Sequence, residues 1–79
     1  MDLITAGQMR AGRALIRWSA EDLAKAAKVG VATVRRAEAA KGDPPITEAN
    51  CNAIQRALEA CGVEFTDGDR PGVRLGTKV

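Results

Sequence analysis

The side chains best suited to chemistry are two adjacent arginines near the middle of the chain. Arg35 and Arg36 follow Val31, Ala32 and Thr33 in a segment with helical spacing. A guanidinium can donate two hydrogen bonds to guanine, an apolar side chain can contact a thymine methyl group, and a hydroxyl can bond a base or a phosphate. We therefore expect Arg36 to contact guanine and Arg35 to contact phosphate. Thymine methyl contacts are expected from Val31 and Ala32, and a base or phosphate contact from Thr33.

Catalysis and metal binding lack the residues that they usually need. The sequence contains no His, which removes the commonest general base and metal ligand. Cys51 and Cys61 form no CxxC pair and lie about 15 Å apart along one expected helix, so we expect two free thiols in a reducing compartment. Asp67 and Asp69 have the spacing of metal ligands but are typical of turns. We therefore expect that the protein is not an enzyme and that it binds no metal, no cofactor and no small-molecule ligand.

The composition favours one small helical domain whose positive charge lies in its first half. The 79 residues are 46% hydrophobic and 28% charged, with one Trp, one Phe and no Tyr, which favours closely packed, alanine-rich helices. The net charge is only +2, but residues 1–41 carry eight basic and four acidic side chains. Arg10 and Arg17 are equally consistent with phosphate contacts and with solubilising charges. The N-terminus shows neither a signal peptide nor a membrane span, so we expect a cytoplasmic protein.

Helix signals place the two arginines directly after a tight turn. Apolar spacing predicts helices over residues 6–17, 20–27, 31–40 and 48–61. Ser19 is expected to cap the second helix, with Trp18 and Leu23 in hydrophobic-staple positions. Lys28-Val29-Gly30 interrupts the pattern before the third helix, and Gly30 can adopt the backbone angles that a turn or a helix start requires. The arginines therefore lie on the helix that follows the turn.

The last part of the chain changes from helical to alternating periodicity. Thr47 is expected to cap the fourth helix, and Gly62 is expected to end it. Residues 63–66 and 73–75 alternate apolar with polar side chains around a turn-rich stretch, which predicts a hairpin. Because isolated hairpins are marginal in water, its apolar side chains must pack on the helices or on a second copy: Val63, Phe65, Val73 and Leu75.

Two short helices joined by a tight turn, with arginines on the second, form a helix-turn-helix arrangement. The sequence resembles the lambda-repressor-like, Xre/Cro family of helix-turn-helix regulators over about residues 9–58, and the match runs through Arg13, Leu23-Ala24, Val29, Thr33-Val34 and Glu38. The resemblance implies a structural ion pair between Arg13 and Glu38. It also implies a phosphate contact near Ser19 and a recognition face made of Val31, Ala32, Thr33 and Arg36.

The chain departs from the family pattern at three positions around the turn. Ala20 stands where the family often has Gln, Lys28 where it often has Gly, and Gly30 where it often has Ser or Thr. The first departure removes a phosphate contact, and we expect Lys28 to supply another. Lys41, in the loop after the third expected helix, is also placed to reach phosphate.

These observations predict a mainly α fold, a four-helix lambda-repressor-like DNA-binding domain over residues 1–62 with a short C-terminal β-hairpin over residues 63–79. The hairpin is a candidate dimerisation element. The expected function is a sequence-specific transcriptional regulator, more readily a repressor than an activator, that binds a palindromic operator in double-stranded DNA as a homodimer. The apolar residues Ala20, Val31 and Ala32 leave one alternative open, a protein-binding module of the same shape, such as an antiactivator or antitoxin, that does not read DNA.

Overall fold

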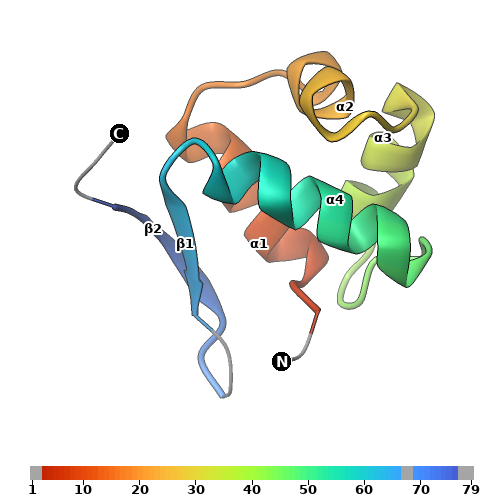
Figure 1. The fold of residues 1–79 in the computed structure, drawn as a ribbon. Coiled ribbons are helices and arrows are strands. Elements are labelled where there is room, and N and C mark those ends of the chain that lie inside the picture. The colour runs from red at the N-terminus through yellow and green to blue at the C-terminus, as the bar shows by residue number, and fades with distance from the viewer. Residues whose placement is uncertain (1–2, 67–68, 77–79) are drawn as a thin grey trace.

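Four helices are followed by an antiparallel hairpin in the computed structural model, which describes residues 3–66 and 69–76 (Figure 1). The helices are α1 (Ala6–Leu15), α2 (Ala20–Ala27), α3 (Val31–Ala39) and α4 (Glu48–Glu59), and the strands are β1 (Val63–Thr66) and β2 (Gly72–Leu75). The mainly helical class with a terminal hairpin is therefore confirmed. The turn expected at Asp67 and Gly68 lies outside the described residues.

Three of the helices begin at a hydroxyl side chain that accepts a backbone hydrogen bond. The hydroxyls are those of Thr5 before α1, Ser19 before α2 and Thr47 before α4. The caps expected at Ser19 and Thr47 are confirmed, and Thr5 supplies a third cap that was not predicted. Each cap satisfies an amide that has no partner inside its helix, so the chain enters these helices at defined positions.

The ends of α1 and α4 lie two residues before the predicted ends. At α1, Arg17 adopts a left-handed conformation with φ of 58°. The Arg17 and Trp18 amides donate back to the carbonyls of Ala14 and Arg13, each at 3.1 Å. This pattern closes the last helical turn and reverses the chain, so Arg17 lies outside the helix. At the end of α4, Gly62 has φ of 92°, a conformation that favours glycine.

The hydrophobic core lies between the four helices and the inner side of β1. α2 packs against α3 and α4, while α1 packs against α3, α4 and the hairpin (Figure 1). The largest fully buried side chains come from all of these helices and from β1: Met9, Leu23, Ile54, Leu58, Val34, Val63 and Cys51. Helices and hairpin therefore share one core.

The hairpin lies against α1 at a position without a side chain. A Cβ atom at Gly12 would lie 3.3 Å from Leu58 Cδ1 and 3.3 Å from Val63 Cγ1, so glycine permits the close approach. Val63 is buried, Phe65 is partly buried, and Leu75 is 42% exposed. The expectation that the apolar face packs on the helices is therefore confirmed for the inner part of the hairpin, and Leu75 remains accessible.

The side chain of Gln8 ties the turn end of the hairpin, where Thr66 pairs with Gly72, to α1. Its Nε2 atom donates to the carbonyl of Thr66 at 2.6 Å and to the carbonyl of Gly72 at 3.1 Å. Its Oε1 atom accepts from the Thr5 amide at 2.8 Å, which completes the cap of α1. Because this buried amide joins both strands to the first helix, the hairpin has a defined position relative to the helices.

Candidate nucleic-acid interface

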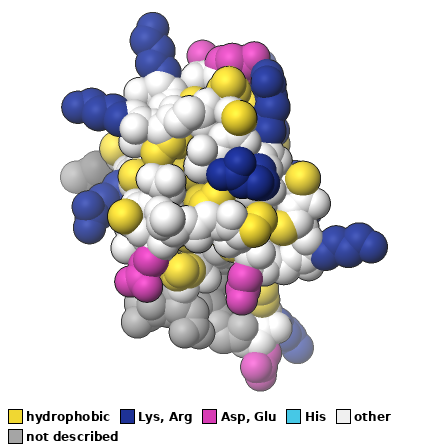
Figure 2. Space-filling view, turned by 90° about the vertical axis from the view of Figure 1, so that its right-hand side faces the viewer, with side chains coloured by type: hydrophobic (Ala, Val, Ile, Leu, Met, Phe, Trp, Pro, Cys, Tyr) yellow, Lys and Arg dark blue, Asp and Glu magenta, His cyan; other side chains and the backbone are white. Residues whose placement is uncertain are grey.

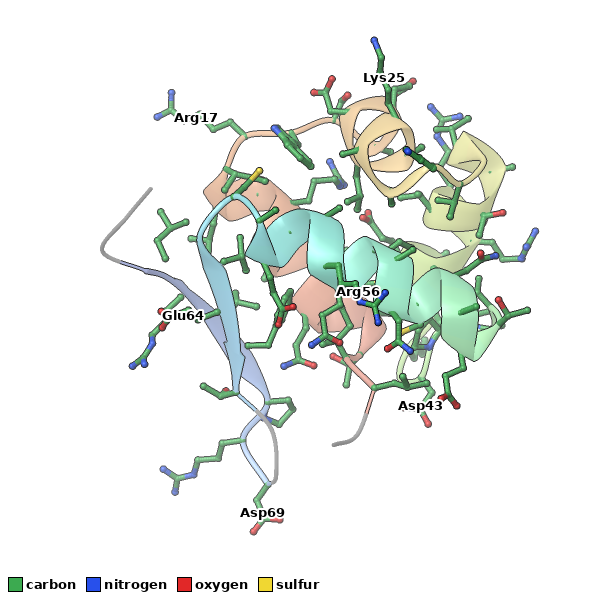
Figure 3. The ribbon with its side chains drawn as sticks, viewed as in Figure 1. Arg17, Lys25, Asp43, Arg56, Glu64 and Asp69 are labelled. Atoms are coloured by element: carbon green, nitrogen blue, oxygen red, sulfur yellow. The ribbon has the colours of Figure 1, made fainter. Side chains whose placement is uncertain are left out.

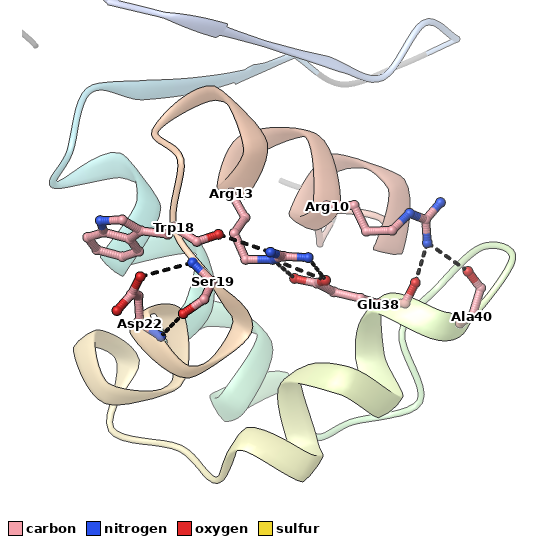
Figure 4. A network of polar contacts seen from close by, with 7 residues as sticks. All are labelled: Arg10, Arg13, Trp18, Ser19, Asp22, Glu38 and Ala40. Atoms are coloured by element: carbon pink, nitrogen blue, oxygen red, sulfur yellow. Dashed lines mark hydrogen bonds and ion pairs between the residues drawn. The ribbon is translucent and has the colours of Figure 1, made fainter.

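The start of α2 is held by a reciprocal cap between Ser19 and Asp22 (Figure 4). Ser19 Oγ accepts from the Asp22 amide at 3.0 Å, and Asp22 Oδ2 accepts from the Ser19 amide at 2.9 Å. Two hydrogen bonds hold the pKa of Asp22 below its usual range. The one from the Ser19 backbone amide has the larger effect, and the one with the Ser19 hydroxyl has the smaller effect. The exposed Ser19 hydroxyl is therefore fixed at the N-terminus of α2, where anions are favoured.

The turn between α2 and α3 contains a left-handed residue and a helix start. Lys28 adopts the left-handed conformation, with φ of 61° and ψ of 42°. The Val29 amide then donates to the Ala24 carbonyl at 3.0 Å and ends α2. Gly30 has ordinary extended angles, with φ of −70°, and precedes α3 without a side-chain cap. The left-handed residue is needed where α2 ends, at Lys28, and Gly30 lies at the start of α3, one of the two positions expected for it.

Helix α3 has a buried side and an exposed side. Val34, Ala37 and Glu38 are its buried residues. Ala32, Arg35 and Arg36 are exposed, while Val31 and Thr33 are half-buried. On the face of the molecule that includes α3, Lys and Arg side chains stand apart from one another with apolar groups between them (Figure 2). The outer side of α3 thus combines hydrogen-bond donors with apolar groups, the two kinds of side chain expected to contact bases.

The two adjacent arginines of α3 differ in their contacts. Arg35 Nη2 lies 2.7 Å from Glu21 Oε2 on α2, in an ion pair whose two side chains are more than half exposed. Arg36 forms no ion pair with any residue that the structure describes. The Glu21 contact was not anticipated, because its partner lies fourteen residues away and neither helix by itself indicates the pairing.

A bidentate ion pair between Arg13 and Glu38 joins α1 to α3 (Figure 4). Arg13 Nε lies 3.0 Å from Glu38 Oε2, and Nη2 lies 2.8 Å from Oε1. Arg13 Nη1 also donates to the Trp18 carbonyl at 2.9 Å, which ties the segment before α2 to the same group. The hydrogen bond with Glu38 raises the pKa of Arg13 against the opposing effect of burial. The ion pair implied by the family resemblance is thus present, and its role is to hold three helices together.

Arg10 also has a structural contact, which differs from both roles considered for it. Its Nη1 atom donates to the backbone carbonyl of Glu38 and, at 3.4 Å, to that of Ala40 (Figure 4). These carbonyls lie at the C-terminus of α3, where a positive charge is favourable. Arg10, which lies on α1, therefore caps the C-terminal end of α3, although its side chain stays exposed.

The predicted site residues lie along one continuous stretch of chain. Ser19 lies at the start of α2, Lys28 at its end, and Lys41 just beyond α3, and all three are exposed. The remaining residues occupy α3: Val31, Ala32, Thr33, Arg35 and Arg36. Lysines therefore flank both ends of the helix whose outer side carries the arginines.

The described residues offer no group of three or more His, Cys, Asp or Glu side chains that could hold a metal ion. Both cysteines are free thiols. None of the helices in the described part of the chain is long and apolar enough to cross a membrane.

Neither a known protein-family model nor a curated protein matches this sequence. The assignment of a function therefore depends on the residues and contacts of the α2–α3 region.

Proposed function

We propose that this protein is a sequence-specific DNA-binding regulator that places α3 in the major groove. The observation that carries the proposal is the two-sided character of α3, buried through Val34 and Ala37 and exposed through Arg35 and Arg36, directly after the turn that follows α2. A helix held in this way on a tightly connected partner helix can enter a groove as a rigid unit.

Each exposed residue has a role that suits its chemistry. Arg36, which has no acidic partner among the described residues, donates to guanine, while Ala32 and Val31 contact thymine methyl groups. Thr33 bonds a base or a phosphate. The phosphate contacts come from side chains around the recognition helix: Ser19, Lys28, Arg35 and Lys41.

The proposal includes a homodimer that binds two half-sites about one helical turn apart. The hairpin supports this arrangement because β1 and β2 form a two-stranded sheet whose Leu75 is 42% exposed. Leu15, at the end of α1, is a second large apolar side chain on the surface, 39% exposed, that a partner copy could cover. Sedimentation of the wild type and of Leu75→Asp tests the dimer: a change to monomers in the variant supports a hairpin contact, and a monomeric wild type excludes it.

The test of DNA recognition begins with selection of an operator from a random duplex library. Fluorescence anisotropy then compares the selected duplex with a scrambled duplex at two salt concentrations. Arg36→Ala is expected to lose about 1–3 kcal/mol of preference for the selected duplex, as one base contact is lost. Arg56→Ala is the matched control, since Arg56 is an exposed arginine on α4 (Figure 3), and it should retain the preference.

The alternative function is a protein-binding module with the same scaffold. The specific observation in its favour is the apolar start of α3. Val31 is half-buried, Ala32 is exposed, and neither side chain can donate a hydrogen bond. A protein that yields no enriched duplex in the selection, and whose weak DNA binding is the same in Arg36→Ala, would favour this alternative over the regulator.

A further inference from the structure

The ion pair between Arg35 and Glu21 lies on the surface that the proposed function brings to DNA. It joins the outer side of α3 to the first turn of α2 through a 2.7 Å contact, and its side chains are 59% and 64% exposed. Exposed ion pairs add little to folding stability. The effect on DNA binding differs, because a guanidinium suited to phosphate is directed toward a carboxylate instead.

The cap of α2 does not require Glu21. The neighbouring Asp22 already exchanges hydrogen bonds with Ser19 and places a negative charge in the first turn. Among the described residues, the Glu21 side chain has one hydrogen bond, and its donor is Arg35. The reciprocal cap is therefore complete without Glu21, whose side chain is instead engaged by Arg35.

We propose that Glu21 is an internal competitor for phosphate, which holds Arg35 in the free protein and lowers the affinity for DNA of any sequence. This inference rests on the proposed function. For Arg35 to reach a phosphate it must leave Glu21, and the carboxylate is then unpaired beside a backbone of the same charge. Arg36 is outside this ion pair, so base reading is unchanged and the competition acts on the sequence-independent part of the affinity.

Glu21→Gln tests the competition because it removes the charge and keeps the size of the side chain. Anisotropy titrations with the selected duplex and the scrambled duplex, over a range of salt concentrations, measure its effect. We expect the variant to bind both duplexes about two- to fivefold more tightly, which corresponds to the strength of an exposed ion pair. The gain should be largest at low salt, because salt screens the exposed ion pair that Arg35 has to leave before it can reach phosphate.

The hairpin provides a matched control for net charge. Glu64 on β1 forms an equally exposed ion pair with Arg74 at 2.6 Å, and Figure 3 shows Glu64 on the hairpin, apart from α2 and α3. Glu64→Gln raises the net charge by the same amount. Once sedimentation shows that this hairpin variant keeps the oligomeric state of the wild type, it is expected to bind DNA as the wild type does. An equal gain in both variants would reject a local competition.

A second variant tests whether the effect passes through Arg35. In the double variant Glu21→Gln with Arg35→Ala, the gain over Arg35→Ala alone should disappear, and a gain that persists would overturn the proposal. Weaker binding by Glu21→Gln would also overturn it, since Glu21 would then position Arg35 for its contact. Circular dichroism of each variant shows that the helices are retained.

The titrations separate failure of this inference from failure of the proposed function. A wild type whose preference for the selected duplex is lost in Arg36→Ala, with Glu21→Gln binding unchanged, overturns the competitor alone. A wild type without sequence preference overturns the proposed regulator and the competitor with it.

Discussion

Arg13 makes the polar contacts that hold α1, α2 and α3 in one arrangement. Its guanidinium bonds both carboxylate oxygens of Glu38 and the carbonyl of Trp18. Glu38 has only 8% of its side chain exposed, so its charge depends on this partner. A buried carboxylate without a counterion costs several kcal/mol of folding free energy, so only helix arrangements that keep Arg13 beside Glu38 are stable. The pair therefore constrains the helix geometry more than it adds net stability.

Replacement of Arg13 by Ala should therefore destabilise the whole domain. We expect a loss of about 2–4 kcal/mol, somewhat below the cost of breaking a fully buried pair because 27% of the Arg13 side chain is exposed. Urea unfolding followed by circular dichroism measures the change. Arg74→Ala, which breaks an exposed pair with Glu64, is the control and should cost less than about 1 kcal/mol. Equal losses in the two variants would contradict a structural role for Arg13.

The two cysteines should differ in reactivity because their surroundings differ. Cys51 is buried, with its Sγ atom 3.9 Å from the Ile4 carbonyl, whereas Cys61 is half-buried. Burial raises the pKa of the Cys51 thiol, so folding favours its neutral form. The neutral Cys51 thiol therefore contributes to the free energy of unfolding. This contribution is complete below the pKa of an unfolded thiol, about 8.5, and is lost as the pH rises through the higher pKa of Cys51 in the folded protein.

Labelling with a thiol reagent at neutral pH tests this difference. In Cys61→Ser, the remaining Cys51 should react only as fast as the protein opens, while in Cys51→Ala the remaining Cys61 should react faster. The stability of Cys61→Ser should also fall at alkaline pH more than that of Cys51→Ala. Rapid labelling of Cys51 in the folded protein would contradict its burial.

At the scale of the elements, the turn between α2 and α3 decides where α3 starts. Lys28 ends α2 in a left-handed conformation, which costs a residue with a Cβ atom about 1 kcal/mol relative to Gly. A lysine at this position therefore carries a conformational cost, and the proposed phosphate contact gives that residue a function.

Lys28→Gly should separate stability from DNA binding. The variant is expected to gain about 1 kcal/mol in unfolding free energy, because Gly adopts the left-handed conformation without steric cost. Its affinity for DNA should fall and its salt dependence should become shallower by about one phosphate contact. Lys28→Gln is the matched control, with the same loss of charge and no gain in stability. A Lys28→Gly variant that is less stable than the wild type would contradict the turn geometry.

At the scale of the whole molecule, the hairpin belongs to the same core as the helices. Val63 is 2% exposed and lies against Gly12 of α1 and the α4 residue Leu58, and Gln8 bonds both strands. These contacts join the first and last elements of the chain. Unfolding of the hairpin should therefore be coupled to unfolding of the helices.

Val63→Ala tests this coupling at a distance. The variant should lose about 1–3 kcal/mol in stability because it leaves a cavity in the core. The loss should appear in the unfolding transition of Trp18, which lies before α2 and reports on the helices. Glu64→Ala changes an exposed neighbour on the same strand and should have little effect. An unchanged Trp18 transition in Val63→Ala would mean that the hairpin unfolds independently.

Most of the elements could be predicted from the sequence because their signals are local. The caps at Ser19 and Thr47 and the alternation around Phe65 act within a few residues, and they mark these elements correctly. The close approach at Gly12 and the two bonds from Gln8 could not be predicted. Both depend on which strand comes to lie on α1, and the local pattern around either residue does not indicate that.

The sequence alone specifies the helix order, the two sides of α3 and, through a family resemblance, the pairing of Arg13 with Glu38. Only the tertiary structure decides which of the other arginines on α1 and α3 are occupied: Arg10 by carbonyls at the end of α3, and Arg35 by Glu21. The reason is that helix periodicity and capping act between near neighbours, whereas a hydrogen bond between helices requires two side chains to meet within about 3 Å in a defined direction. Such contacts depend on how the helices pack. Of the two adjacent arginines, that packing pairs Arg35 with Glu21 and gives Arg36 no ion-pair partner among the described residues.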